Sequence, residues 1–230
     1  MDSGMLFDFD DTLVETTIYF DRAKILFAGI MKELGFPVQE ALEVLDRNDI
    51  KNVRLYGGFL KECFPYALGE TYEYCCRKYG RAYSRVLRKE IEGLGWWVFE
   101  QPVSLIEGAE EVLSRLCGKY PLFLVTKGDP GVQRDRIEKS GLSRWFEKIY
   151  ILTEKNSIVY KKIADEQGIS PPASWLIGNS MKSDINPALL AGFNCIYVHH
   201  PCTWGFENEE PVGGHLSIER INDVLKVLGL

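Results

Sequence analysis

Near the N-terminus the sequence reads Met5-Leu6-Phe7-Asp8-Phe9-Asp10-Asp11-Thr12-Leu13-Val14. Its first three residues are apolar, which is typical of a short buried strand. Side chains alternate along a strand, so Asp8 and Asp10 point to the same face at its carboxyl end. Burying two neighbouring carboxylates costs free energy unless a cation or a shared proton compensates. The pattern therefore predicts a functional acidic site, and the alternative is a strand that runs into an acidic surface turn.

Length and composition are those of an ordinary globular enzyme. The chain has 230 residues, of which 46% are hydrophobic and 26% charged, enough for one large domain or a domain with an insert. The net charge of −6 argues against non-specific binding to nucleic acid or to anionic membranes, so we expect neither partner. No apolar run approaches the roughly twenty residues that span a bilayer, and no secretion signal is evident. We expect a cytoplasmic protein.

The cysteines do not predict a metal site. Six cysteines are scattered without the spacing of metal ligands, and reduced thiols are the default expectation for a cytosolic protein. The run His199-His200-Pro201-Cys202 contains zinc-ligand residue types but has no second ligand cluster along the chain. We therefore predict no zinc site there.

The order of patterns along the chain indicates a helical insert in an α/β domain. Residues 16–92 have helical periodicity, with expected helices at 18–34, 38–45, 53–60 and 71–91, breaks at 63–65 and Gly69, and a return linker at 93–95. Apolar runs follow at 120–125, 148–152, 175–177 and 195–198, separated by helical stretches. These stretches cover 109–116, 132–139, 157–166 and 185–191. Such alternation predicts a parallel sheet, which binds ligands at the carboxyl ends of its strands.

Polar residues follow several of these apolar runs. The hydroxyl of Thr126 and the turn amides of Lys127 and Gly128 could hold phosphate oxygens, although a threonine there is often only a turn residue. Lys155 follows the next run, where a fixed cation beside Asp8 would offset the crowded negative charge. The nearby lysines at 161 and 162 fall inside the following helix, so Lys155 is the better candidate.

These clusters, taken in order, resemble the four motifs of the haloacid dehalogenase superfamily, whose members are mostly phosphatases. The motifs are Asp8-x-Asp10-x-Thr12, the strand ending in Thr126, Lys155, and the run Gly178-Asn179-Ser180-Met181-Lys182-Ser183-Asp184. The resemblance covers about residues 5–15 and 100–200. It implies a Rossmann-like three-layer α/β core with a parallel sheet at 1–15 and 97–230, and an inserted all-helical cap domain at 16–96.

The resemblance also implies site roles. Asp8 would be the nucleophile and Asp10 the general acid and base, while Thr126, Lys127, Gly128 and Lys155 would bind the phosphoryl group. Mg²⁺ would be held by Asp8, the carbonyl of Asp10, and Asp184, with Asn179 in support. Asn179 stands where many relatives carry an aspartate, and Asn156 follows Lys155 where many carry proline. The substrate would be a small phosphorylated metabolite.

Other functions stay open at the level of sequence. Haloacid dehalogenases of this superfamily need no magnesium and lack an acid at the position of Asp10, so Asp10 and Asp184 favour phosphoryl transfer. A phosphomutase or a phosphonatase is a further alternative. A non-catalytic protein that binds a phosphate ligand is the last, and Asn179 is its only support. The sequence indicates neither the particular substrate nor the oligomeric state.

Overall fold

The computed structural model of the chain describes residues 2–230. The chain divides into two compact units, which we call the core unit and the helical unit. The core unit comprises the residues up to Thr17 together with Val103–Leu230, and the helical unit comprises Ile18–Pro102. Within the part of the chain that is described, no helix is both long and apolar enough to cross a lipid bilayer.

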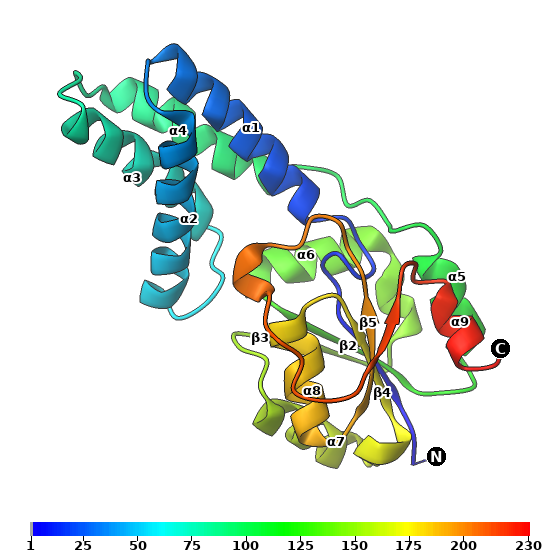
Figure 1. Cartoon of the computed structure of the whole chain (residues 1–230). Helices are drawn as coiled ribbons and strands as arrows, with labels where there is room; N and C mark the ends of the chain where they lie inside the picture. The colour runs from blue at the N-terminus through cyan, green and yellow to red at the C-terminus, as the bar shows by residue number, and fades with distance from the viewer. Residues whose placement is uncertain (1) are drawn as a thin grey trace. The chain divides into compact units, whose positions relative to one another are not determined.

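The core unit is built on a six-stranded parallel sheet with the order β3-β2-β1-β4-β5-β6 (Figure 1). This confirms the predicted α/β fold with a parallel sheet. The sequence patterns indicated every strand except the last, which is short and half exposed. The strands are β1 (Met5–Phe7), β2 (Leu122–Lys127), β3 (Lys148–Leu152), β4 (Trp175–Gly178), β5 (Asn194–Val198) and β6 (Leu216–Ile218).

Helices cover both faces of this sheet, because the strand side chains alternate between two hydrophobic clusters. Phe7 belongs to the cluster that includes residues of α5, α6 and α9, and Leu6 to the cluster that includes residues of α7 and α8. The helices are α5 (Ala109–Leu116), α6 (Pro130–Ser140), α7 (Ser157–Gln167), α8 (Asn186–Ala191) and α9 (Asp223–Val227). Helices α6 and α7 end at glycines with positive φ, Gly141 at 68° and Gly168 at 63°.

The helical unit has its own hydrophobic core. Buried side chains on α1 to α4 pack together, among them Phe27, Leu45, Tyr72 and Ile91. The helices are α1 (Thr17–Glu33), α2 (Val38–Leu55), α3 (Cys63–Lys78) and α4 (Arg85–Val98).

Several expectations for the helical unit are wrong. The breaks predicted at 63–65 and Gly69 lie inside α3, and the linker predicted at 93–95 lies inside α4. The glycines there do not end helices but allow them to approach each other. A Cβ atom on Gly95 would come within 2.6 Å of the Cα of Pro65, and a Cβ atom on Gly69 within 2.4 Å of the Glu92 carboxylate. The single helix expected at 71–91 is interrupted between α3 and α4, and the two helices expected at 38–45 and 53–60 form one helix, α2, which ends at Leu55.

Candidate active site

The candidate site lies at the carboxyl ends of the central strands. Strand β1 pairs with β2 on one side and with β4 on the other, so the direction of the chain connections reverses there. Ligands in parallel α/β sheets bind at such a reversal point. Asp8 directly follows β1, Thr126 lies near the end of β2, and Asn179 directly follows β4. Lys155 lies in the loop between β3 and α7.

A buried lysine connects two aspartates from distant parts of the chain. The Lys155 ammonium lies 2.5 Å from Asp8 Oδ1 and 2.7 Å from Asp184 Oδ1. The three side chains are almost fully buried, with at most 8% of any one exposed. Two carboxylates share one ammonium, so the group carries a net negative charge when all three are ionised.

The burial and the sharing of one cation shift the pKa values of this group. Burial, followed by the charge of Asp184, raises the pKa of Asp8 from 3.8 to about 7, although Lys155 opposes the rise. Burial alone would lower the pKa of Lys155, but the charges of Asp184 and Asp8 outweigh it and hold that pKa well above 10.5. Lys155 is therefore a permanent cation, and Asp8 depends on additional positive charge to ionise fully at neutral pH.

The backbone around Gly178 places Asp184 beside the lysine. Asp184 lies in a short π-helical segment, η3 (Met181–Ile185), a type of irregularity that is frequent at functional sites. Its Oδ2 accepts a hydrogen bond from the amide of Ser180 at 3.0 Å. A Cβ atom at position 178 would lie 2.6 Å from Asp184 Oδ2, so only glycine fits there. Both oxygens of Asp184 are thus occupied, one by Lys155 and one by the backbone.

The side-chain amide of Asn179 faces three oxygen atoms. One of its atoms lies 3.2 Å from Asp8 Oδ2, 3.2 Å from the Thr12 hydroxyl oxygen and 3.1 Å from the backbone carbonyl oxygen of Asp10. With nitrogen in that place the amide donates to these acceptors, whereas with oxygen there the one Thr12 hydroxyl proton serves either Asn179 or Asp8 Oδ2, and a cation can satisfy the remaining acceptors. The separations from Asp8 Oδ2 and from the Asp10 carbonyl match the edge of an octahedron, about 3 Å for metal–oxygen bonds of about 2.1 Å. These three groups therefore fit a magnesium ion.

The Asp10 carboxylate is held by residues that the sequence analysis did not identify. Its Oδ1 accepts from the Thr16 hydroxyl at 2.7 Å and from the Arg136 guanidinium, and its Oδ2 accepts from the Gln133 amide at 2.7 Å. Burial alone would raise the pKa of Asp10, but the charge of Arg136 and these three hydrogen bonds lower it overall. Asp10 is therefore a carboxylate in this arrangement.

The expected phosphate-binding residues of β2 are only partly available. Thr126 is fully buried, and its hydroxyl oxygen accepts a hydrogen bond from Gln133 at 2.6 Å. The amide of Gly128 donates to the carbonyl of Leu152 at 3.1 Å, because the pairing of β2 with β3 continues to that residue. A phosphate oxygen would have to displace this bond to reach the Gly128 amide.

The Lys127 side chain connects the site to a later loop. Its ammonium lies 2.8 Å from Glu207 Oε1 and 2.5 Å from the Ser183 hydroxyl. The other oxygen of Glu207 accepts from the hydroxyls of Ser180 at 2.7 Å and Ser183 at 2.5 Å. These contacts hold the loop around Glu207 beside η3. No local sequence pattern indicated this arrangement.

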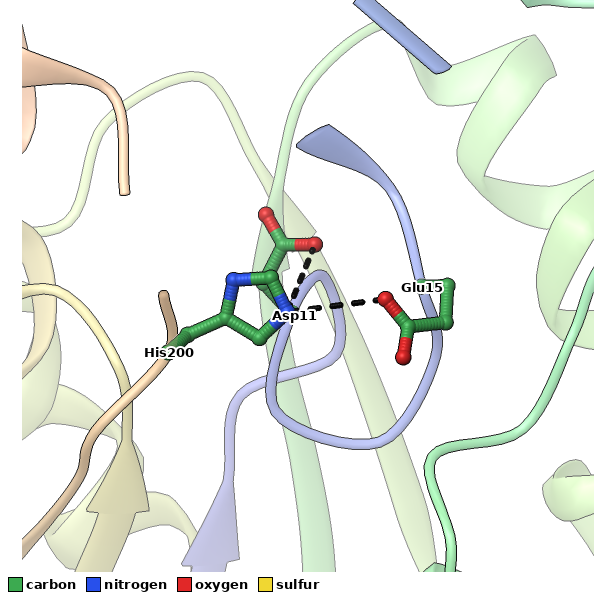
Figure 2. A group of neighbouring side chains, drawn as sticks. All are labelled: Asp11, Glu15 and His200. Carbon is green, nitrogen blue, oxygen red and sulfur yellow. Dashed lines mark ion pairs between the residues drawn. The ribbon is translucent and has the colours of Figure 1, made fainter. Parts of the chain in front are cut away.

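A second acidic cluster lies where the chain leaves the core unit. Figure 2 shows His200, from the loop after β5, beside Asp11 and Glu15. The distances from His200 Nε2 are 3.8 Å to Asp11 Oδ1 and 3.5 Å to Glu15 Oε2. Asp11 has a φ of 58°, and its carboxylate caps α1 by accepting from the amides of Thr16 at 2.8 Å and Thr17 at 2.9 Å. Its oxygens are already bonded, so this cluster holds the start of α1 in place.

The structure therefore brings the predicted residues together in two groups. Asp8, Lys155 and Asp184 are in direct contact, and Asn179 faces Asp8 and the Asp10 carbonyl. The Asp10 side chain and Thr126 meet through Gln133. Gln133 and Arg136 were missed, although one signal was present: they are three residues apart on the helix after Thr126, and so share one of its faces.

Comparison with known proteins agrees with this geometry. The sequence model of the haloacid dehalogenase-like hydrolases matches residues 5–198 of the chain. A curated relative is the N-acylneuraminate-9-phosphatase of Rattus norvegicus, which is 25% identical over 202 residues. The aligned region covers 82% of this chain and 79% of that protein.

Solved structures show the same fold. A haloacid dehalogenase-like family hydrolase from Xanthomonas campestris superposes with a TM-score of 0.79 at 24% identity, covering 99% of this chain and 94% of that one. The HAD-hydrolase YfnB from Bacillus subtilis, whose structure was solved with bound magnesium, gives a TM-score of 0.65 at 19% identity and covers 99% of each chain.

Proposed function

The chain belongs to the haloacid dehalogenase-like hydrolase family, and from that premise we propose that it is a magnesium-dependent phosphatase acting on a small phosphate monoester. The observation that carries the proposal is the buried Lys155 ammonium in contact with both Asp8 and Asp184. This group places a nucleophilic carboxylate beside a permanent cation that can neutralise an incoming phosphoryl group. The phosphatase among the relatives supports the same reaction class.

The reaction divides into two displacements at phosphorus. In the first, an oxygen of Asp8 attacks phosphorus, the ester P–O bond breaks, and Asp10, which must have taken up a proton before this step, gives that proton to the leaving oxygen. In the second, Asp10 takes a proton from a water molecule whose oxygen attacks phosphorus, the bond to Asp8 breaks, and inorganic phosphate leaves. The three donors around Asp10 support its ionised form, which is the form that accepts this proton.

Oxygen donors around Asp8 support the assignment of magnesium. Asp8 Oδ2, the Asp10 carbonyl and the Asn179 amide oxygen would hold the ion. The Asp184 carboxylate contacts Lys155, so its negative charge would act on the ion from a longer distance. When bound, Mg²⁺ supplies positive charge that neutralises the phosphoryl oxygens and favours attack by the carboxylate. Asp8, whose pKa burial and the charge of Asp184 raise to about 7, would ionise fully beside this additional positive charge.

Around this centre, Lys155 and the Thr126 hydroxyl would orient the phosphoryl oxygens, together with the backbone amide of Lys127. We assign Gly128 a role in the tight turn after β2, where its φ is 145°, because its amide already donates to the Leu152 carbonyl. The helical unit Ile18–Pro102 would act as the cap that selects the leaving group. A small phosphorylated metabolite is the substrate class, as for the rat phosphatase, and we place the protein in the cytoplasm.

Phosphoryl transfer is favoured over halide displacement by Asp10. A departing halide needs no proton, so a dehalogenase has no use for a carboxylate at this position. Here Asp10 is held by three separate donors. A phosphomutase would need a phosphorylated second substrate as acceptor in place of water, and no described residue singles out such an acceptor.

The test is hydrolysis of p-nitrophenyl phosphate and of a panel of sugar phosphates and nucleotides with and without magnesium. We expect turnover that EDTA abolishes and magnesium restores. Asp8→Asn removes the nucleophile and should lower kcat by about 10³-fold or more. Asp165→Asn, an exposed aspartate on α7, is the matched control and should leave kcat unchanged.

Each other outcome contradicts the proposal in a specific way. Halide release from a haloacid that EDTA does not affect would identify a dehalogenase. No turnover of any phosphate ester, with phosphate still bound, would identify a binding protein. Turnover by the Asp8→Asn variant would show that another residue is the nucleophile.

A further inference from the structure

We propose that Gln133 and Arg136 form a positioning pair that sets the Asp10 carboxylate and the Thr126 hydroxyl relative to each other. The inference rests on the proposed phosphatase reaction, in which Asp10 faces the leaving group and Thr126 faces the phosphoryl oxygens. Both residues come from α6, and neither belongs to the motifs that identified the site.

One nitrogen atom of Gln133 connects the Asp10 carboxylate with the Thr126 hydroxyl. Its Nε2 donates to Asp10 Oδ2 at 2.7 Å and to Thr126 Oγ1 at 2.6 Å. A primary amide has two N–H groups, so both are used. Because Thr126 accepts from Gln133, its own hydroxyl proton is free to be donated to a phosphoryl oxygen. Gln133 is only 3% exposed, so water cannot easily replace it as the donor.

Arg136 holds the other oxygen of Asp10. One of its nitrogens pairs with Asp10 Oδ1, and the other donates to the Thr16 hydroxyl at 2.7 Å. Thr16 in turn donates to the same Asp10 oxygen at 2.7 Å, which closes a triangle of three groups. The guanidinium also lies 5.6 Å from the centre of the Phe9 ring. The planar guanidinium contacts Asp10 with one nitrogen and Thr16 with the other, an arrangement that the single nitrogen of a lysine ammonium cannot reproduce in full.

The helix itself keeps the pair in place. Residues three apart project from one face of a helix, so Gln133 and Arg136 reach Asp10 side by side. The start of α6 is capped by Asp129, which accepts from the amides of Gly131 at 2.9 Å and Val132 at 3.0 Å. Pro130 occupies the first turn, where it favours helix formation. A rigid first turn sets where the Gln133 side chain begins.

The test for Arg136 is the dependence of kcat/KM on the leaving group. Arg136→Met leaves Asp10 misplaced, so the rate should fall by about 10²-fold or more for phenyl phosphate, whose leaving group requires a proton. For dinitrophenyl phosphate, which leaves without protonation, the fall should stay below about threefold. Arg134→Met, an exposed arginine on the same helix, is the matched control and should not change either rate. Arg136→Lys should restore part of the loss.

The test for Gln133 adds a second measurement. Gln133→Leu should show the same dependence on the leaving group, and it should also weaken inhibition by inorganic phosphate, because Thr126 loses its fixed orientation. Arg136→Met does not touch Thr126 and should leave phosphate inhibition unchanged. If Gln133→Leu does not fold, Gln133→Glu replaces it: the extra carboxylate beside Asp10 should cause the same two losses.

The outcomes separate this inference from the proposed function. If the unaltered protein hydrolyses no phosphate ester, the proposed function fails and the inference fails with it. If the unaltered protein is active but Arg136→Met lowers the rate equally for all leaving groups, or not at all, only the positioning role is overturned. Equal losses would mean that Arg136 serves only to stabilise the fold.

Discussion

At the scale of the single residue, the proposed function predicts that Asn179 sets how strongly the site binds a cation. Its amide faces Asp8 Oδ2 and the carbonyl of Asp10, where a carboxylate would add one negative charge. An amide can satisfy these acceptors without an ion by presenting its nitrogen, whereas an aspartate there would repel Asp8. We therefore expect Asn179 to keep the site stable in the metal-free protein.

Asn179→Asp should make the protein more dependent on magnesium. In EDTA the new carboxylate would lie 3.2 Å from Asp8 Oδ2 with no magnesium ion to offset their repulsion, so the melting temperature should fall. With magnesium present, the added charge should tighten magnesium binding. A given magnesium concentration should therefore raise the melting temperature of the variant more than that of the unaltered protein. Thermal unfolding across a magnesium titration measures both.

Asn208→Asp is the control for the added charge, because Asn208 is exposed. It should change neither the melting temperature in EDTA nor the response to magnesium. If Asn179→Asp behaves like this control, the Asn179 amide does not face the ion.

At the scale of the element, α3 and α4 depend on glycines for their close contact. A Cβ atom at position 95 would lie 2.6 Å from the Cα of Pro65, whereas one at position 93 would meet nothing within 4 Å. The same substitution at two positions of α4 should therefore have opposite effects.

Gly95→Ala should lower the free energy of unfolding by about 1–3 kcal/mol, because the two helices must move apart. Gly93→Ala should raise it by about 0.5–1 kcal/mol, because alanine favours the helix and fits without contact. Urea unfolding followed by circular dichroism measures both values. Equal effects of the two substitutions would show that α3 and α4 are not closely packed at Gly95.

A buried carboxyl on α2 makes the stability of the helical unit depend on pH. Burial raises the pKa of Asp49 from 3.8 to about 7, an effect that Lys24 opposes and Asp46 adds to. A carboxyl with a raised folded-state pKa binds its proton more tightly when folded. The contribution of Asp49 to stability is therefore complete below its pKa in the unfolded state. It is lost as the pH rises through its pKa in the folded state.

Asp49→Asn should remove this loss. At about pH 8 the variant should be more stable than the unaltered protein by up to about 4 kcal/mol, since one pKa unit corresponds to about 1.4 kcal/mol. The difference should shrink towards zero at about pH 4. Thermal unfolding across this range measures it. Asp46→Asn, which loses a partly exposed ion pair with Lys24 and removes a charge that repels Asp49, should change stability by about 1 kcal/mol or less. A difference that does not vary with pH would contradict the burial of an ionising Asp49.

At the scale of the whole molecule, the ion pair between Lys127 and Glu207 joins segments that are 80 residues apart. Their side chains are 19% and 13% exposed, so each charge has lost most of its water. Burial raises the pKa of Glu207, but the charge of Lys127 and its hydrogen bonds outweigh this and lower the pKa overall. The pair holds the loop after β5 against the end of β2.

A double-mutant cycle should reveal this coupling. Glu207→Gln removes the carboxylate charge that pairs with the Lys127 ammonium and should lower the free energy of unfolding by about 1–3 kcal/mol. Lys127→Met should do the same to Glu207. The double variant should lose less than the sum of the two, with a coupling of about 1–3 kcal/mol in urea unfolding. Strict additivity would mean that the two charges do not interact.

The amino-acid sequence by itself determined the α/β fold and the side of the sheet that carries the candidate site. Strand and helix periodicity are local properties, and parallel strands must bring their carboxyl ends to one edge. That is why Asp8, Lys155 and Asp184 could be expected to meet although 147 residues separate the first two.

Only the tertiary structure decided which side chains surround these residues. The partners of Asp10, the fastening of Glu207 and the packing of Gly95 on Pro65 depend on the direction in which each side chain projects after the elements have packed. A glycine predicts a helix break from the sequence, because its conformational freedom is a local property. Its missing side chain allows close packing only where another helix lies against it, which the sequence does not show. Contacts between distant segments leave no periodic signal, so the structure was needed to find them.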